Sequence, residues 1–422
     1  MHIHGGPATV KAVLSAIPNC TQLPSESYIR YAEPGEFTRR AFQNDRLTLD
    51  QVEALSDTLS AETEQQRRAA IRGHSGKLGR TYESWRSLLL YARGELEALI
   101  DFSEDQHFDE SPAELLSSVT GQIKEVLDQI AKHELASHRG ELLKKGIRIA
   151  LIGPPNAGKS SLLNRIVGRE ASIVSQEAGT TRDVVEVSLD IHGYLCTFAD
   201  TAGLRTEPVS QASTISTPVI GAIEQEGIKR AKAKAQESDV IIVLASIEPC
   251  PGPDKWQIQY DEETVSTLPK DKPCLIVVNK CDLVDETSAV LSEFTSTLPI
   301  TQQRLVPIPI SCHYTISSFS DDNITTFLTS LTSVFETMTS PPPEEEDLVG
   351  VTARQRQLLV SCRSHLQNFM LEASQGDEVD IVIAAEHLRE AANCLSRITG
   401  RGEAGDVEEV LGVVFEKFCV GK

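Results

Sequence analysis

The segment GPPNAGKS at residues 153–160 has the residue types and the spacing of a phosphate-binding loop. It lies between the apolar run IRIALIG and the stretch SSLLNRIV, so it would connect the end of a strand to the start of a helix. Backbone N–H groups of such a loop and of the helix N-terminus bind phosphate oxygens. Lys159 would add positive charge beside the β- and γ-phosphates, and Ser160 would supply a hydroxyl to Mg²⁺. We expect nucleotide contacts from Gly153, Asn156, Ala157, Gly158, Lys159, Ser160 and Ser161.

Two later segments, GTTRD at 179–183 and DTAG at 200–203, come in the order expected of elements that respond to the γ-phosphate. Asp200 would hold Mg²⁺ through water, and the backbone of Gly203 would contact the γ-phosphate. Thr181 would close over Mg²⁺ with its hydroxyl only while the γ-phosphate is present.

The segment NKCD, which begins at Asn279, predicts the base that the site selects. Asp282 can accept two hydrogen bonds, from the N1–H and the exocyclic amine of guanine, and adenine offers no such pair. We expect Asn279 to fix the surrounding loops and the stem of Lys280 to pack on the ring. Ser311 and Cys312 would place a backbone amide near the guanine oxygen. Four elements in this order predict a GTPase and disfavour an ATPase.

The water-activating group is not obvious from these motifs. The residue after DTAG is Leu204, where Ras-like enzymes have the glutamine that orients water. Arg182 and Arg205 are candidates for an arginine finger, although exposed arginines in such segments more often serve structure.

Buried β-branched strands alternate with helical stretches from residue 146 to residue 340. This pattern predicts an α/β domain with a mostly parallel sheet and helices on both faces. The expected strands are IRIALIG, LCTFAD, VIIVLA, CLIVVN and RLVPIPI.

Helical periodicity flanks this α/β domain on both sides, over residues 45–145 and 349–422. A stiff, charged linker, residues 341–348 with the run PPPEEED, separates the second stretch from it. We therefore expect one all-α helical bundle into which the α/β domain is inserted, because close chain termini permit such insertions. Residues 1–44, with an apolar helix and a strand-like YIRYA, predict only a fragment of an α+β N-terminal domain.

The bulk composition excludes several classes. The chain has 422 residues and a formal net charge of −21, which argues against non-specific adhesion to nucleic acid or to an anionic membrane. No apolar run approaches the roughly 20 residues of a membrane span, so we expect no membrane partner. The nine cysteines contain no CxxC pair and favour free thiols in a reducing compartment. His2 and His4 lack a nearby third metal ligand.

Motifs outside the nucleotide site add a family resemblance that runs over essentially the whole chain. The chain resembles the MnmE (also TrmE) family of tRNA-modifying GTPases in HGG at 4–6, PGEFTRRAFQNDRLTLDQVEA at 34–54, AGTTRD at 178–183, IEQEGIKRA at 223–231 and the C-terminal FCVGK. The resemblance implies that the GTPase domain is inserted into a helical bundle. It also implies that catalysis depends on K⁺, bound by Asn156 and by a loop over Ser175 to Thr180 that includes Glu177. It assigns the water-orienting carboxylate to Glu224, beside the catalytic roles of Lys159, Asn156 and Thr181.

The same resemblance implies partners and a pathway. Two GTPase domains would pair across K⁺ to form a homodimer. Hydrolysis would drive modification of the wobble uridine (U34) of tRNA at C5, with a tetrahydrofolate derivative as one-carbon donor and an FAD-containing MnmG (GidA) partner. Arg46 and Lys422 match basic positions expected to contact the folate. Cys419 is expected to be structural or near the ligand, because no histidine is adjacent to activate it.

The N-terminal domain of the family is longer than that of this chain. Either the chain is a fragment or an incomplete gene model, or folate binding is lost. We favour the first interpretation, because the expected folate contacts Arg46 and Lys422 remain. A form that keeps only the GTPase cycle is the alternative. An Era-like regulator of ribosome assembly is a second alternative, which the acidic linker and helices after Pro343 disfavour because an RNA-binding KH module would stand there. The Ser/Thr-rich segment between Arg205 and Glu224 and the cysteine usage favour a mitochondrial (matrix) member, with a bacterial cytoplasm as the alternative.

Overall fold

The computed structural model describes most of the chain. The described residues are 2–20, 30–101, 112–169, 171–177, 186–199, 233–250, 256–266, 268–269, 271–284, 286–298, 306–313, 319–342, 348–375 and 379–400. No helix within these ranges is long and apolar enough to cross a membrane.

The described part of residues 1–44 is helical. It contains α1 (Pro7–Ala16), the short 3₁₀ helix η1 (Ile17–Cys20) and α2 (Glu36–Gln43). The strand expected at YIRYA is wrong for residues 30–32, which belong to no strand. No described strand pairs with this segment, and the Arg30 guanidinium instead bonds the Glu36 carboxylate, with Nη1 to Oε2 at 2.8 Å.

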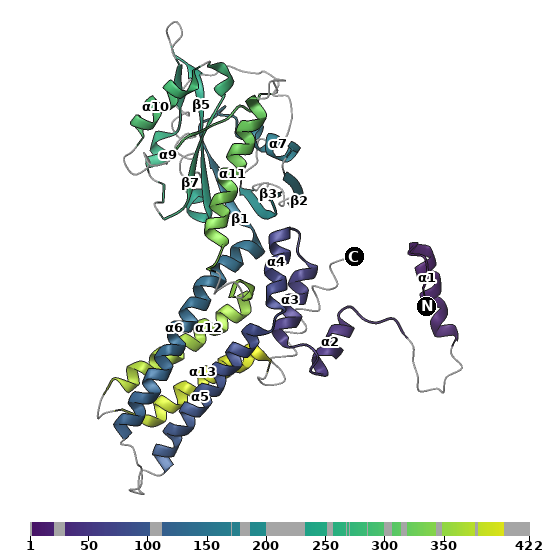
Figure 1. Cartoon of the computed structure of the whole chain (residues 1–422), viewed down its shortest axis with the longest axis vertical. Coiled ribbons are helices and arrows are strands. Elements are labelled where there is room, and N and C mark those ends of the chain that lie inside the picture. The colour runs from purple at the N-terminus through teal and green to yellow at the C-terminus, as the bar shows by residue number, and fades with distance from the viewer. Residues whose placement is uncertain are drawn as a thin grey trace, which may run out of the picture.

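The predicted helical stretches form helices, and the four longest of those named here share one apolar core. Their bounds are α3 (Leu49–Leu59), α4 (Glu64–Gly73), α5 (Lys77–Asp101), α6 (Pro112–Lys145), α12 (Ala353–Ala373) and α13 (Ile381–Thr399). Residues of α5, α6, α12 and α13 bury their apolar faces together, and Figure 1 shows these four helices running alongside one another. Capping boxes start α3, α4 and α12, each with a threonine at the N-cap and a glutamine three residues later.

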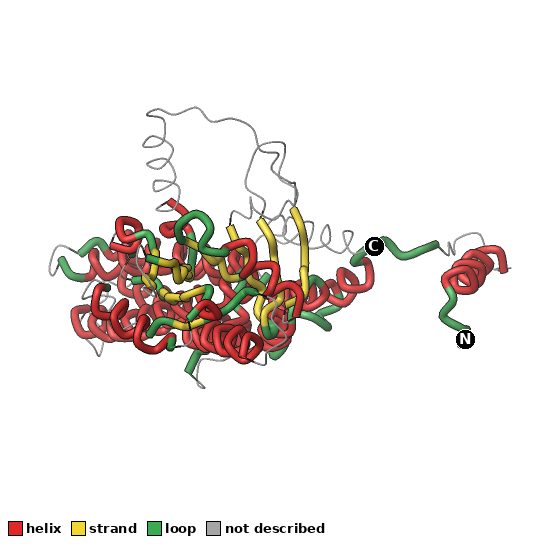
Figure 2. The backbone as a smooth tube through the Cα atoms, turned by 90° about the horizontal axis from the view of Figure 1, so that it is seen from above, coloured by secondary structure: helices red, strands yellow, loops and turns green. Residues whose placement is uncertain are grey.

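The α/β part contains a sheet whose eight described strands follow the order β2-β3-β4-β1-β5-β7-β8, with β6 on β5. The strands are β1 (Ile147–Ile152), β2 (Ala171–Glu177), β3 (Glu186–Ile191), β4 (Tyr194–Ala199), β5 (Val240–Pro249), β6 (Trp256–Gln259), β7 (Cys274–Asn279) and β8 (Ile308–Pro309). β1 pairs in parallel with β4 and β5, and β7 pairs in parallel with β5 and β8. β3 pairs antiparallel with β2 and β4, and β6 pairs antiparallel with β5, so the sheet is mixed. Figure 2 shows the strands in yellow among the red helices.

Both faces of the sheet are buried, as the sequence pattern predicts for its central strands. In β1 the side chain of Ile149 joins one core and that of Ala150 joins the other. The first core includes side chains of α7 (Lys159–Arg169) and α11 (Phe319–Thr339), and the second includes Phe294 of α10 (Thr287–Thr297). The remaining short elements are α9 (Glu262–Ser266) and η2 (Cys281–Leu283).

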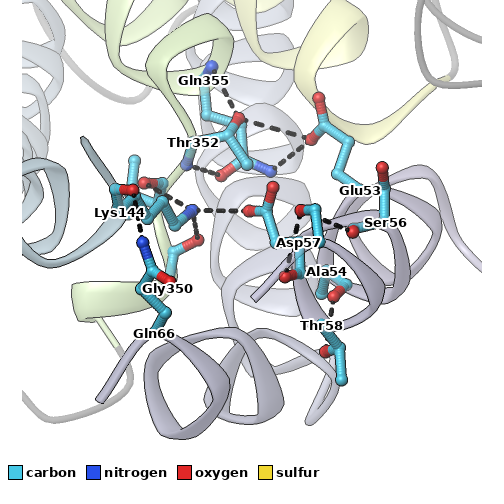
Figure 3. A network of polar contacts seen from close by, with 12 residues as sticks. Glu53, Ala54, Ser56, Asp57, Thr58, Gln66, Lys144, Gly350, Thr352 and Gln355 are labelled. Carbon is cyan, nitrogen blue, oxygen red and sulfur yellow. Dashed lines mark hydrogen bonds and ion pairs between the residues drawn. The ribbon is translucent and has the colours of Figure 1, made fainter. Parts of the chain in front are cut away.

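The chain enters and leaves the α/β part at one polar node, shown in Figure 3. The ammonium of Lys144, at the end of α6, donates to the carbonyl of Gly350 (3.3 Å) and pairs with Asp57 of α3 (2.9 Å). Gln66 of α4 donates to the carbonyl of Lys144 (2.9 Å). Close backbone packing supports the node, because a Cβ on Gly140 of α6 would overlap the carbonyl oxygen of Val349.

A second group of contacts fixes the start of α12 beside this node. Glu53 of α3 is 7 % exposed, and its carboxylate accepts hydrogen bonds from Arg354 (Nε, 2.7 Å) and Gln355 (Nε2, 3.0 Å). Arg354 also donates to the carbonyl of Arg397 (2.9 Å), near the C-terminal end of α13. One buried carboxylate therefore links the first half of the helical part to the second.

Candidate nucleotide site

The phosphate loop lies where the sequence predicts: residues 153–158 connect β1 to α7, and Lys159 is the first residue of that helix. Two positions of the loop require glycine because other atoms lie close to their Cα atoms. A Cβ on Gly153 would overlap the Leu244 carbonyl, and one on Gly158 would overlap the Asn279 amide nitrogen. Gly158 also has a φ of +98°, which side-chain-bearing residues rarely adopt. Asn156 has a φ of 65°, a left-handed conformation that asparagine tolerates better than most residues.

The Lys159 ammonium lies against the loop that it serves. Its Nζ donates to the carbonyls of Gly153 (2.7 Å) and Pro154 (2.9 Å). A phosphate bound at the start of α7 would therefore meet a positive charge and a helix N-terminus together. Ser160 follows as the second residue of α7 and Ser161 as the third, so the proposed hydroxyl ligand lies in the first helical turn.

Asn279 joins the phosphate loop to the base-recognition loops. Its side chain is 3 % exposed; Nδ2 donates to the Ala157 carbonyl (2.9 Å), and Oδ1 accepts from the Cys312 N–H (3.2 Å). Through these two bonds Asn279 joins the loop of Ala157 to the loop of Cys312. Both Ala157 and Asn279 are buried, so solvent competes little with the bonds.

The Asp282 carboxylate is oriented by the side chain of Ser311, a residue that was expected to contribute only through the backbone. The Ser311 hydroxyl donates to Asp282 Oδ1 at 2.6 Å, and it accepts from the His313 N–H at 3.3 Å. The motif predicts that Ser311 lies near the base. It does not predict the bond from the Ser311 hydroxyl to Asp282, because that bond depends on the path of the loop after β8.

Lys280 has a neighbour that sequence reasoning missed. Its ammonium forms an ion pair with Glu248 Oε1, near the end of β5, and the Ser246 hydroxyl donates to the same oxygen at 3.1 Å. The predicted strand VIIVLA ends before these residues, but β5 continues to Pro249. The pairing follows from the register of β5 against β7, and no local motif indicates it.

Burial lowers the acidity of the cysteines at the site. It raises the pKa of the Cys312 thiol to about 12, although the positive charge of the buried Arg165 on α7 opposes the shift. Burial likewise raises the pKa of Cys281 to about 11. Thiols with such pKa values remain protonated near neutral pH, so these two residues are not nucleophiles there.

Several expected site residues lie outside the described residues. They are Thr180, Thr181, Asp200, Gly203, Glu224 and Lys422, and with them Arg182, Leu204, Arg205 and Cys419. Ser175 and Glu177 are described, but they belong to strand β2 and not to a loop, so the loop expected over 175–180 starts at its earliest after Glu177. Arg46 is exposed. It lies just after α2, and in the chain it precedes every strand of the sheet. Among the described residues, no group of three or more His, Cys, Asp or Glu is arranged to hold a metal ion.

A phosphate loop between a parallel strand and a helix, tied by a buried asparagine to a guanine-recognition motif, defines the class of P-loop GTPases.

Comparisons with known proteins identify the family. The model of the MnmE helical domain matches residues 49–419, and that of the GTP-binding protein TrmE N-terminus matches residues 1–46. The chain is 40% identical to the tRNA modification GTPase MnmE of Parvibaculum lavamentivorans, over 100% of this chain and 82% of the relative. It is 37% identical to the mitochondrial tRNA modification GTPase mss1 of Schizosaccharomyces pombe, over 100% of this chain and 80% of the relative. The chain therefore belongs to the MnmE (TrmE) family, and it is a GTPase.

A third relative and a solved structure also match the chain. The chain is 36% identical to a mitochondrial 5-taurinomethyluridine tRNA synthase subunit of Danio rerio, over 100% of this chain and 78% of the relative. A crystal structure of Aquifex aeolicus Era is 25% identical, covers 53% of this chain and 67% of its own, and has a TM-score of 0.28. So low a TM-score supports no inference about this fold.

Proposed function

We propose that this chain hydrolyses GTP at the loop 153–160 as the GTPase component of tRNA modification at C5 of the wobble uridine (U34). The observation that carries the proposal is the buried Asn279 amide, which bonds the phosphate loop at Ala157 and the base loop at Cys312. One side chain thus holds both ends of the nucleotide site together. Lys159 would bind the phosphates, and Asp282 would select guanine through its two acceptor oxygens.

The proposed Mg²⁺ site follows from the same motifs, and the proposed K⁺ site is what the resemblance to the MnmE family implies. Ser160, Thr181 and Asp200 would hold Mg²⁺, and Asn156, Ser175, Glu177 and Thr180 would hold K⁺. Hydroxyl, amide and carboxylate oxygens are the ligands that such hard cations prefer, and the exposed Asn156 is accessible to one. When bound, the cations offset negative charge on the phosphate oxygens during hydrolysis.

Glu224 would orient the attacking water, as the resemblance to the MnmE family implies, and the aliphatic Leu204 cannot take this role. Glu224→Ala should abolish hydrolysis while GTP still binds, measured by phosphate release and by binding of a fluorescent GTP analogue. Glu237→Ala, at an exposed acid in the following helical stretch, is the matched control and should hydrolyse GTP normally. Hydrolysis should be faster in K⁺ than in Na⁺, and equal rates in the two salts would exclude the proposed K⁺ site.

The partners are a further part of the proposal. The synthase-subunit name of the Danio rerio relative supports action within a complex, and we propose an FAD-containing MnmG-type partner and a homodimer paired through the GTPase domains. Arg46 and Lys422 would contact the carboxylates of a tetrahydrofolate derivative. Titration with a folate analogue should show binding that Arg46→Ala weakens; absence of binding would favour a chain that keeps only the GTPase cycle.

We also propose a division into domains. Residues 1–44 form part of a folate-binding domain, 45–145 and 349–422 form one helical domain, 146–340 form the inserted GTPase domain, and 341–348 form a linker. The shared core of α5, α6, α12 and α13 supports the insertion, because these helices come from both sides of the sheet in the sequence.

Relatives named mitochondrial and bacterial MnmE proteins match at similar identity. We propose the mitochondrial matrix as the location, on the Ser/Thr-rich segment before Glu224, with a bacterial cytoplasm as the alternative. Fractionation of cells that carry the protein tests this choice.

A further inference from the structure

Glu248 is an acidic residue on a rigid strand, next to the base-recognition motif. In the register of β5 with β7, Ser246 lies opposite Asn279, which places Glu248 just beyond the motif. On the other side β5 pairs with β6, where Glu248 lies opposite Gln257. The backbone of Glu248 is thus held by sheet pairing on one side of β5 even though its side chain reaches solvent.

The Glu248 carboxylate has two partners on one oxygen. Oε1 accepts from the Ser246 hydroxyl at 3.1 Å and pairs with the ammonium of Lys280. The hydrogen bond from Lys280 lowers the pKa of the Glu248 carboxyl, so it is ionised at neutral pH. Ser246 is 1 % exposed and fixes the carboxylate from the buried side.

Lys280 is also fixed at its other end. Its φ of 65° and ψ of 29° place the backbone in the left-handed region, and the following Cys281 N–H donates to the carbonyl of Ile310 at 3.2 Å. A lysine side chain is ordinarily free in several torsions, and ordering it on binding opposes affinity. With both ends held, the direction of the apolar stem is set before any ligand binds.

We propose that Glu248 is a positioning residue for guanine binding: it anchors the Lys280 ammonium so that the lysine stem is preformed as one wall of the base site beside Asp282. The inference rests on the proposed roles of Lys280 and Asp282. Glu248 touches no ligand and acts only through Lys280.

The experiment is a double-mutant cycle on nucleotide release. Dissociation of fluorescent GDP is followed by stopped flow for the full chain, Glu248→Gln, Lys280→Met and the double variant. Glu248→Gln keeps the size of the side chain and removes its charge, so we expect release to be faster by about three- to fivefold, the upper part of the range for exposed ion pairs. In the Lys280→Met background the same substitution should change the rate less than about 1.5-fold, because the anchored group is gone.

Two controls separate positioning from charge and from folding. Glu262→Gln removes an exposed acid on α9 and should leave release unchanged. Equal thermal midpoints for Glu248→Gln and the parent chain would show that the fold is intact. Equal effects of Glu248→Gln with and without Lys280, or no effect at all, would overturn the proposal.

Failure of the underlying function is distinguishable. Xanthine carries a carbonyl where guanine carries its exocyclic amine, so Asp282→Asn should exchange guanine preference for xanthine preference. If the parent chain binds ADP as well as GDP, the assignment of Lys280 and Asp282 fails. If guanine selection and the Asp282→Asn exchange hold while Glu248→Gln is silent, only the inference about Glu248 fails.

Discussion

At the scale of single residues, the nucleotide site depends on side chains that bond other loops. The Asn279 amide can donate and accept at once, which allows it to bridge Ala157 and Cys312. An aspartate of the same shape has only acceptors and cannot replace the bond to the Ala157 carbonyl. Its neighbour Gly158 must lack a side chain to leave room for the amide.

Gly158→Ala should therefore abolish tight nucleotide binding. The added Cβ would overlap the Asn279 Nδ2 atom at a backbone φ of +98°, so both the loop and the bridge must shift. Isothermal titration with GDP should show at least about a tenfold weaker affinity, equal to about 1.4 kcal/mol. Gly94→Ala is the control, because a Cβ there meets nothing within 4 Å; retained affinity in Gly158→Ala would contradict the proposed crowding.

The positions of the motif residues could be predicted from the sequence because their chemistry is tied to local spacing around a strand end and a helix start. Glu248 and Ser311 could not be assigned, because their partners Lys280 and Asp282 are distant in the chain. Such contacts depend on strand register and on the path of a loop, which local patterns do not encode.

At the scale of elements, the long helices and the central parallel strands match the sequence prediction. The prediction missed β2, β3 and β6, because short strands at the sides of the sheet are half polar and lack a continuous apolar run. The helical stretch predicted up to residue 145 is confirmed at its end, where α6 runs from Pro112 to Lys145.

Helix α6 allows a matched test of the polar node. Gly140→Ala would place a Cβ onto the Val349 carbonyl, so we expect a loss of stability of about 1–3 kcal/mol in urea unfolding. Gly121→Ala lies at an exposed position of the same helix, with nothing within 4 Å of its Cβ. It should stabilise by up to about 1 kcal/mol through helix propensity, and equal effects of the two changes would refute the crowding at Gly140.

The helical core also contains a buried histidine that should make its stability depend on pH. His133 is 6 % exposed, its ring lies 4.8 Å from that of Trp85, and its Nδ1 is 3.3 Å from the Tyr82 hydroxyl. Burial lowers the pKa of His133 to about 4, below its ordinary value of 6.5. The unfolded chain therefore takes up a proton at a higher pH than the folded chain does.

The contribution of neutral His133 should be complete above about pH 6.5 and decrease as the pH falls toward about 4, by on the order of 3 kcal/mol in total. Urea unfolding at intervals between these pH values measures it. His133→Gln removes the titrating group, so its stability should fall less steeply over the same interval. Parallel curves for the two proteins would show that other groups cause the pH dependence.

At the scale of the whole molecule, two parts of the chain meet at one place. Lys144 lies in the segment that leads into β1. Its ammonium donates to the carbonyl of Gly350, in the segment that leads into α12, and pairs with Asp57. The helical core is built from residues on both sides of this crossing. Hydrophobic patterning predicted the two helical stretches. It could not predict the contacts of Lys144 with Gln66 and Asp57, because these depend on how α3 and α4 pack.

We predict that the proposed helical domain folds without the α/β part. In a variant that joins Lys145 to Leu348 through a short glycine linker, the helices should keep a cooperative thermal transition, because a shorter loop is no harder to close. Circular dichroism and a melting curve measure this, and residues 146–342 expressed alone should still bind GDP. A helical variant without a cooperative transition would mean that the two parts fold only together.

The clamp at Lys144 and Gly350 has a mechanical consequence. Two polypeptide segments that are fastened side by side act as a single pivot, about which an attached body can turn but along which it cannot easily slide. Any rotation of the nucleotide-binding unit would then reach α6 and α12 at the same moment and with the same sign. A change at the phosphate site that turned the nucleotide-binding unit would therefore move α6 and α12 together.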